Sequence, residues 1–134
     1  ERGLFFVQKI NIEYDILTML RKLGLNVLYK AHPDRKNEVY GLFDNIADKV
    51  IYDAFENSWK EADAFIFTYT STTTFAFALE TNRRVVLIDV DTNIVDKGLR
   101  QELGKRVDYV PATITDSNNL IKFDKRKLKE CLLL

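Results

Sequence analysis

The stretch that decides the fold is Ala62–Asp91, ADAFIFTYTSTTTFAFALETNRRVVLIDVD. It contains a short apolar and aromatic run, Phe65–Tyr69, and ends in an aliphatic run, Val85–Ile88. Short apolar runs of this kind are typical of strands buried in a sheet. Between them, Phe75–Glu80 has helical character. The stretch therefore predicts a strand, a hydroxyl-rich turn, a helix and a second strand, which is the repeating unit of a parallel α/β sheet.

The turn is a run of five hydroxylated residues, Thr70, Ser71, Thr72, Thr73 and Thr74. In a parallel sheet such a turn lies at the carboxyl end of its strand, where ligands bind. One interpretation is that the run only caps the helix. The other is that its hydroxyl and N–H groups hold a phosphate or pyrophosphate. The run lacks both the glycines of a dinucleotide fingerprint and the Gly-Lys-Ser/Thr of a P-loop, so a phosphate would be bound without either motif.

The composition is that of one ordinary globular domain. The 134 residues carry 20 Lys and Arg against 20 Asp and Glu, so no overall field favours nucleic acid or an anionic membrane. With one cysteine, Cys131, and one histidine, His32, we expect no metal site, no intrachain disulfide and a cytoplasmic setting. Because the sequence starts abruptly with an apolar run close behind, we expect residues 1–134 to be a single domain belonging to a longer chain.

Working outward, the pattern predicts strands and helices in alternation. Upstream we expect a strand at Leu4–Val7, a helix from Asn11 to the stop at Gly24, strands at Asn26–Lys30 and Val50–Tyr52, and a helix at Trp59–Ala62 capped by Ser58. Downstream we expect a weak helix at Lys97–Arg106, an edge strand at Val107–Val110 ending before Pro111, and a final helix capped by Asp124, with Phe123 and Leu128 at hydrophobic-staple spacing. This order predicts a Rossmann-like three-layer sandwich with a mainly parallel sheet.

His32 lies at the end of the second predicted strand, where Pro33 holds it extended. An imidazole there can donate to a phosphate or act as a general acid, and a purely structural role is the alternative. Because the carboxyl ends of parallel strands share one edge, we expect His32 and the hydroxyl run to converge. Glu80 follows Thr73 by two helical turns, and its carboxylate is either a ribose ligand or a solvated group at the helix end.

The basic residues near the C-terminus form one charge run: Lys122, Lys125, Arg126, Lys127 and Lys129. Most runs of this kind are solvated helix faces. The alternative is a surface for an acidic partner or a membrane.

Two motifs together resemble the C-terminal, donor-binding half of GT-B glycosyltransferases, in particular the bacterial surface-polysaccharide and CDP-glycerol (teichoic acid) transferases. The first is YKAHPD, Tyr29–Asp34, and the second is ADAFIFTYTSTTTFAFALETNRRVVLID, Ala62–Asp89. The resemblance covers about Asn26–Asp91. It implies one half of a GT-B fold, in which His32 and the turn of Thr70, Ser71, Thr72 and Thr73 hold the donor's phosphates and His32 is the candidate catalytic residue. It also implies no metal and no cofactor, only a nucleotide-activated sugar or polyol donor as substrate.

The chain departs from the family pattern at several positions. Phe77 occupies the place where many members carry a ribose-binding Glu, so either Glu80, one turn further along, substitutes for it or the chain belongs to a branch without that contact. Asn82, Arg84 and Thr68 replace the usual Gly, Pro and Asp. The resemblance also implies a missing N-terminal acceptor domain, inactivity of this chain in isolation, and peripheral membrane association of the full-length protein. The alternatives are half of a sugar-nucleotide epimerase and a flavodoxin-like interaction module.

Overall fold

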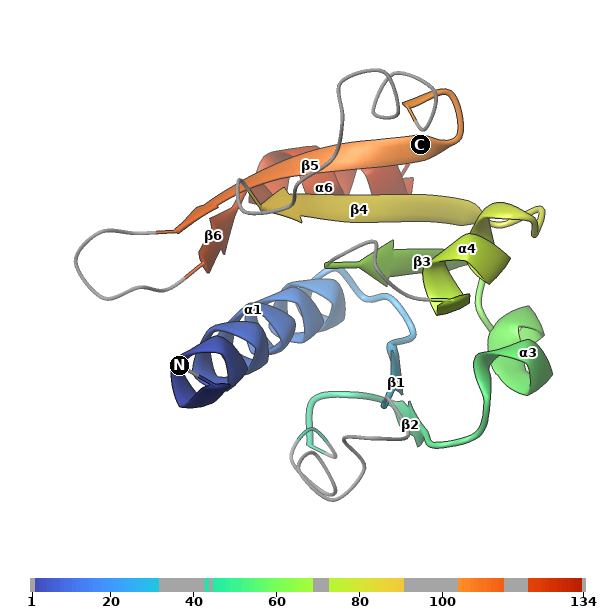
Figure 1. Ribbon diagram of the computed structural model, residues 1–134, viewed down its shortest axis with the longest axis horizontal. Coiled ribbons are helices and arrows are strands. Elements are labelled where there is room, and N and C mark those ends of the chain that lie inside the picture. Colours follow the sequence, from blue (N-terminus) through green and yellow to red (C-terminus); the bar gives the residue numbers. More distant parts are fainter. Residues whose placement is uncertain are drawn as a thin grey trace. The chain divides into compact units, whose positions relative to one another are not determined.

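The computed structural model describes residues 2–31, 43, 45–68, 73–90, 104–114 and 121–133 (Figure 1). The chain forms two compact units, Glu1–Glu61 and Ala62–Leu134. The first contains α1 (Arg2–Lys22), β1 (Leu28–Lys30), β2 (Lys49–Ile51), α3 (Phe55–Ser58) and the 3-10 turn η2 (Trp59–Glu61). The second contains β3 (Ala64–Phe67), α4 (Thr73–Leu79), β4 (Arg84–Val90), β5 (Val107–Ile114), β6 (Ile121–Phe123) and α6 (Lys125–Leu133). The predicted mixed α/β class is confirmed.

The predicted strand at Leu4–Val7 is wrong, because these residues belong to α1. A four-residue apolar run has no periodicity that separates a strand from a helix. No Gly or Pro lies between Leu4 and Leu23, so the helix continues through the run and Asn11 lies inside it instead of capping it.

The predicted stop of α1 is confirmed at Gly24, whose φ is 78°. The N–H of Gly24 donates to the carbonyl of Arg21 at 3.0 Å, and the N–H of Leu25 donates to the carbonyl of Leu20 at 3.2 Å. This pair of bonds is a Schellman motif, which satisfies the last carbonyls of the helix and requires the left-handed conformation that glycine adopts most easily.

The two predicted strands of the first unit are confirmed as β1 and β2, which pair in parallel with Tyr29 opposite Val50. Asp48 fixes the start of this pair, since its carboxylate accepts the Val27 N–H at 2.6 Å and lies 3.3 Å from the guanidinium of Arg21. The core beneath consists of Leu17, Val27, Tyr29, Ala31, Phe43 and Ala47.

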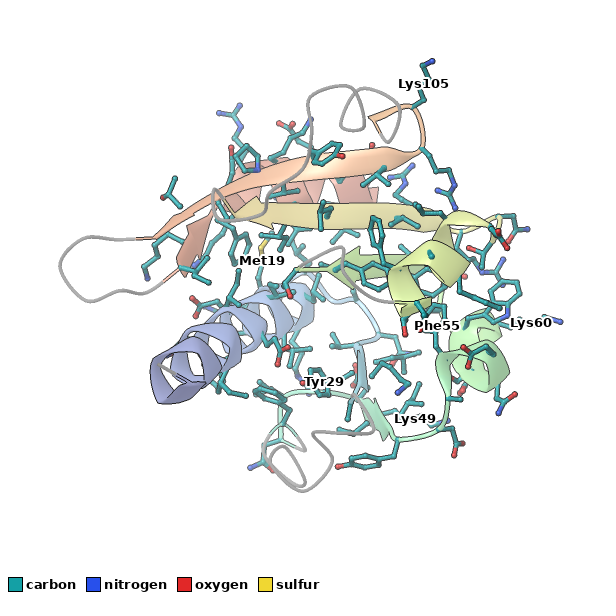
Figure 2. All side chains as sticks on the ribbon, viewed as in Figure 1. Met19, Tyr29, Lys49, Phe55, Lys60 and Lys105 are labelled. Carbon is teal, nitrogen blue, oxygen red and sulfur yellow. The ribbon has the colours of Figure 1, made fainter. Side chains whose placement is uncertain are left out.

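Tyr29 joins α1 to this core from β1 (Figure 2). Its ring meets Phe43 edge to face with centroids 4.8 Å apart, and its hydroxyl donates to the Glu13 carboxylate at 2.8 Å. The polar tip of a mostly buried tyrosine is thereby satisfied.

Ser58 is not the cap that its sequence position predicted. The helix α3 begins at Phe55 and Ser58 is its last residue, with its hydroxyl donating to the carbonyl of Ala54 at 3.2 Å. A serine hydroxyl can either cap the start of a helix or donate to the backbone carbonyl four residues earlier. The backward bond is formed here, and the chain continues as η2.

The second unit is a four-stranded sheet in the order β3, β4, β5, β6 (Figure 1). The first three strands are parallel and β6 is antiparallel to β5. Val85, Val86, Leu87 and Ile88 of β4 have no exposed surface. Since alternate residues of a strand point to opposite faces, both faces of β4 are covered.

The two faces of this sheet are covered by different helices, with α4 on one side and α6 on the other (Figure 1). Phe75 of α4 packs edge to face on Phe67 of β3, with ring centroids 5.1 Å apart. On the opposite face, a guanidinium N–H of Arg84 donates to the carbonyl of Cys131 in α6.

The prediction of an edge strand ending before Pro111 is wrong. The strand β5 lies between β4 and β6 and continues through Pro111 to Ile114. The Pro111 carbonyl accepts the Asp124 N–H at 2.9 Å, and the N and O atoms of a strand residue point to the same side. The missing N–H of Pro111 therefore faces the Asp124 carbonyl, which already accepts the Leu128 N–H at 3.1 Å. The Asp124 carbonyl is thus paired without an N–H from Pro111, which is why proline is tolerated here.

The predicted start of the last helix is confirmed. The Asp124 carboxylate accepts the Lys127 N–H at 3.0 Å, as a capping residue does. Phe123 and Leu128, on either side of the cap, are both buried.

Candidate functional site

The β3–α4–β4 unit carries the hydroxyl run. β3 and β4 are parallel, with Ala64 opposite Arg84 and Phe67 opposite Leu87. β3 ends at Phe67 and α4 begins at Thr73, so residues 68–72 connect the carboxyl end of β3 to the helix. The predicted strand, helix and second strand are confirmed in this order, while residues 69–72 of the predicted turn lie outside the described residues. In open α/β sheets this edge is where ligands bind.

Most of the predicted site residues lie outside the described residues: His32, Thr70, Ser71 and Thr72. Two are described. Thr73 is the first residue of α4 and is exposed, and Glu80 follows the last residue of α4 and is also exposed. A rise of 1.5 Å per helical residue separates them by about 10 Å along the helix. The structure therefore places Glu80 at the far end of α4 from the hydroxyl run, and its role toward a ribose stays a prediction.

The far end of α4 is held by Arg106, the residue before β5. Its Nε donates to the carbonyl of Leu79 at 3.1 Å. Its Nη2 lies within 3.3 Å, 2.8 Å and 2.7 Å of the carbonyl oxygens of Ala78, Thr81 and Arg83. A cation at this position satisfies carbonyls that the helix leaves free and complements the helix dipole. Arg106 thus ties the end of α4 and the α4–β4 turn to the start of β5.

Two more side chains of the α4–β4 turn make hydrogen bonds at the edge of the sheet where β3, β4 and β5 begin. The Thr81 hydroxyl donates to the Ala78 carbonyl at 2.7 Å and accepts the Arg83 N–H at 3.2 Å. The Arg83 Nε donates to the Ala62 carbonyl, before β3, at 2.8 Å. The edge opposite the hydroxyl run is therefore a rigid support, which fixes α4 relative to β3 and β4.

In the first unit, Lys30 ends β1 two residues before His32. Its ammonium donates to the Ala31 carbonyl at 2.6 Å. Partial burial lowers the pKa of Lys30 below its ordinary value, and the carboxylates of Glu56 and Asp53 oppose that shift. Lys30 thus supplies a partly buried amine within the YKAHPD motif.

Cys131 is poorly placed to act as a nucleophile. Cys131 is a buried free cysteine, and burial raises the pKa of its thiol, with the Asp108 carboxylate acting in the same direction. A thiol that keeps its proton is a poor nucleophile.

The described ranges contain neither a metal-ligand cluster nor a helix that could cross a membrane. No group of three or more His, Cys, Asp or Glu side chains within them can hold a metal ion. No helix there is long and apolar enough to cross a membrane, and α1, the longest at 21 residues, carries charged residues along its length.

No family model, no curated protein and no solved structure matches the chain. Function is therefore inferred from the two sequence motifs and from the β3–α4–β4 unit that contains the second of them.

Proposed function

We propose that this chain is the donor-nucleotide-binding domain of a GT-B-type transferase that builds a cell-surface polysaccharide. The observation that carries the proposal is the parallel β3–α4–β4 unit. It corresponds to the second motif that resembles this family, and its connection from β3 to α4 contains Thr70, Ser71 and Thr72 of the hydroxyl run. Phosphates bind at this edge in many open α/β sheets.

In this proposal residues 1–134 form one Rossmann-like three-layer domain, half of a GT-B fold. Support comes from β4, which is buried on both faces between α4 and α6. The free thiol of Cys131 is compatible with the cytoplasmic setting in which such a domain would meet its donor.

The proposed site holds the donor's phosphates with Thr70, Ser71, Thr72 and Thr73 and with His32. During transfer the bond between the donor group and the nucleotide's phosphate oxygen breaks, and negative charge develops on that oxygen. Hydroxyl, N–H and imidazole donors placed beforehand stabilise this charge. The acceptor hydroxyl forms the new bond and loses its proton to a base that the acceptor domain of a GT-B transferase supplies. The isolated domain therefore binds donor without turning it over.

The test is an NMR titration of the isotopically labelled chain with CDP, CMP and UDP. The proposal predicts shifts concentrated on the amides of residues 68–74 and on Ala31 and its neighbours. If none of the three nucleotides perturbs any amide at millimolar concentration, the nucleotide-binding proposal fails and a flavodoxin-like interaction module is favoured. If shifts occur only on α6, the site has been assigned to the wrong part of the chain.

A further inference from the structure

One face of α6 carries several cations and, at the last residue of the helix, an exposed leucine. The residues Arg126, Lys129, Glu130 and Leu133 recur at helical spacing and line one shallow hollow. Leu128 and Cys131, on the other side of the helix, are buried. The outer face of α6 consists of this stripe and its two flanking lysines, that is, Lys125, Arg126, Lys127, Lys129, Glu130 and Leu133.

The outer face of α6 is strongly cationic. Its four basic side chains belong to exposed residues, and Glu130 is the single carboxylate among them. The Nε of Arg126 lies 3.7 Å from a Glu130 carboxylate oxygen, yet the Arg126 side chain is 90% exposed. An exposed pair of this kind is weak, so Arg126 remains available to an external anion. Four cations and one carboxylate give this face a net charge of +3.

Lys122 belongs to the same basic run of the sequence but not to this face. It is exposed on β6, opposite Thr113 of β5, and its neighbour Phe123 is buried. Because adjacent strand residues point to opposite faces, Lys122 and Phe123 lie on different sides of the sheet. Lys122 therefore supplies a matched control for charge removal.

We propose that the outer face of α6 docks on a membrane surface rich in anionic lipids. The cations contact the headgroup phosphates, and Leu133, which is 53% exposed, enters the boundary between headgroups and acyl chains. A basic helical face that also exposes an apolar side chain, here at the last residue of the helix, offers cations to the headgroups and an apolar group to the acyl boundary, as helices that lie on membranes do. Each Lys or Arg near an anionic bilayer strengthens binding about fivefold.

A membrane suits this face better than an acidic protein does. The cations are long, flexible side chains spread over a convex helix, and their charge complements a continuous layer of anionic headgroups. Stable anchoring takes two signals, and one face of net charge +3 supplies only one of them. The docking is therefore weak and reversible, and it does not depend on nucleotide binding.

The experiment is co-sedimentation of the 134-residue chain with vesicles of phosphatidylcholine alone or mixed with phosphatidylglycerol. We expect binding only to the mixed vesicles, and loss of binding as added salt shortens the screening length. The double variant Arg126→Gln/Lys129→Gln should weaken binding about 25-fold, since each lost cation contributes about fivefold. The control Lys105→Gln/Lys122→Gln removes the same charge from other surfaces and should bind nearly as wild type does. Lys105 is exposed and projects away from the sheet (Figure 2).

Leu133→Ser separates a membrane from other anions. It should weaken binding to mixed vesicles and leave binding to soluble polyglutamate unchanged. The proposal is overturned if wild type ignores mixed vesicles at low salt, or if the two double variants lose binding equally. It is also overturned if Leu133→Ser binds vesicles as wild type does, because the face would then recognise polyanions in general. Circular dichroism of each variant checks that the fold is retained.

Discussion

The Nη2 of Arg106 donates to the carbonyl oxygen of Thr81 at 2.8 Å, which joins the residue before β5 to the turn after α4. The same guanidinium reaches the carbonyls of Ala78, Leu79 and Arg83. One side chain thus fixes the α4–β4 connection from the edge of the sheet opposite the hydroxyl run. The position of α4 relative to the start of β5 depends on this arginine.

Replacement of Arg106 by lysine should be costly although the charge is kept. An ammonium cannot reproduce a planar fork that donates to four carbonyls. We expect Arg106→Lys to lower the free energy of unfolding by about 1–3 kcal/mol, the range for hydrogen bonds to a charged group that lose their donor. Urea denaturation measures this. The same change at the exposed Arg126 is the control and should fall within about 0.5 kcal/mol of wild type. Equal effects at both sites would contradict the role given to Arg106.

Gly24→Ala should destabilise the end of α1. The φ of Gly24 is 78°, and a Cβ added there would meet nothing within 4 Å, so the penalty is conformational and not steric crowding. A left-handed residue other than glycine costs roughly 1–2 kcal/mol. Gly104→Ala is the matched control, because a Cβ there would meet only Tyr109 Cε2 at 4.0 Å, an ordinary contact. Thermal unfolding of the two variants should separate them. A Gly24→Ala protein as stable as wild type would show that the Schellman motif does not form.

Asp48→Ala should loosen the start of β1. The carboxylate accepts the Val27 N–H at 2.6 Å, and its removal leaves a partly buried donor unpaired, at a cost of about 1–3 kcal/mol. Asp48→Asn keeps one acceptor oxygen and should lose less. Hydrogen exchange at the Val27 amide reports the local effect directly. The account fails at this position if the Val27 amide exchanges at the same rate in Asp48→Ala and Asp48→Asn.

The Cys131 thiol should react slowly in the native protein. Burial raises the pKa of Cys131 in the folded state above that in the unfolded chain. The unfolded thiol therefore ionises first as pH rises, so the stability contributed by the protonated thiol is lost at alkaline pH. Labelling with a disulfide reagent at mildly alkaline pH should be slow in native conditions and fast in denaturant. Cys131→Ser should remove the corresponding alkaline loss of stability. Labelling at the same rate in both conditions would contradict the buried position.

The elements that the sequence predicted correctly are those that residues close together in the chain specify. Two apolar runs on either side of a helical segment were enough to predict the β3–α4–β4 unit. Gly24 and Asp124 marked a helix end and a helix start through their own backbone or side-chain chemistry. Each of these signals acts within a few residues of the structure it specifies.

The predictions failed where the outcome depended on distant partners. Leu4–Val7 has the composition of a strand, and membership of the long helix α1 overrides it. Pro111 ends a strand in most contexts, but here the opposing carbonyl of Asp124 is used by α6. Arg106 gave no local signal, because its acceptors lie 23 to 28 residues earlier in the chain. The site residues His32, Thr70, Ser71 and Thr72 lie outside the described residues and stay predictions.

The most direct test of the nucleotide-binding account is calorimetric titration of CDP and UDP into wild type and two single variants. Ser71→Ala removes a proposed phosphate ligand, and Thr113→Ala removes an exposed hydroxyl from β5 as a control. The account predicts that at least one nucleotide binds wild type and Thr113→Ala equally, and that Ser71→Ala weakens binding about 10- to 150-fold, which corresponds to the roughly 1.5–3 kcal/mol of one hydrogen bond to a charged group. His32→Ala should weaken it similarly. Unchanged affinity in both Ser71→Ala and His32→Ala, with the fold intact, would contradict it.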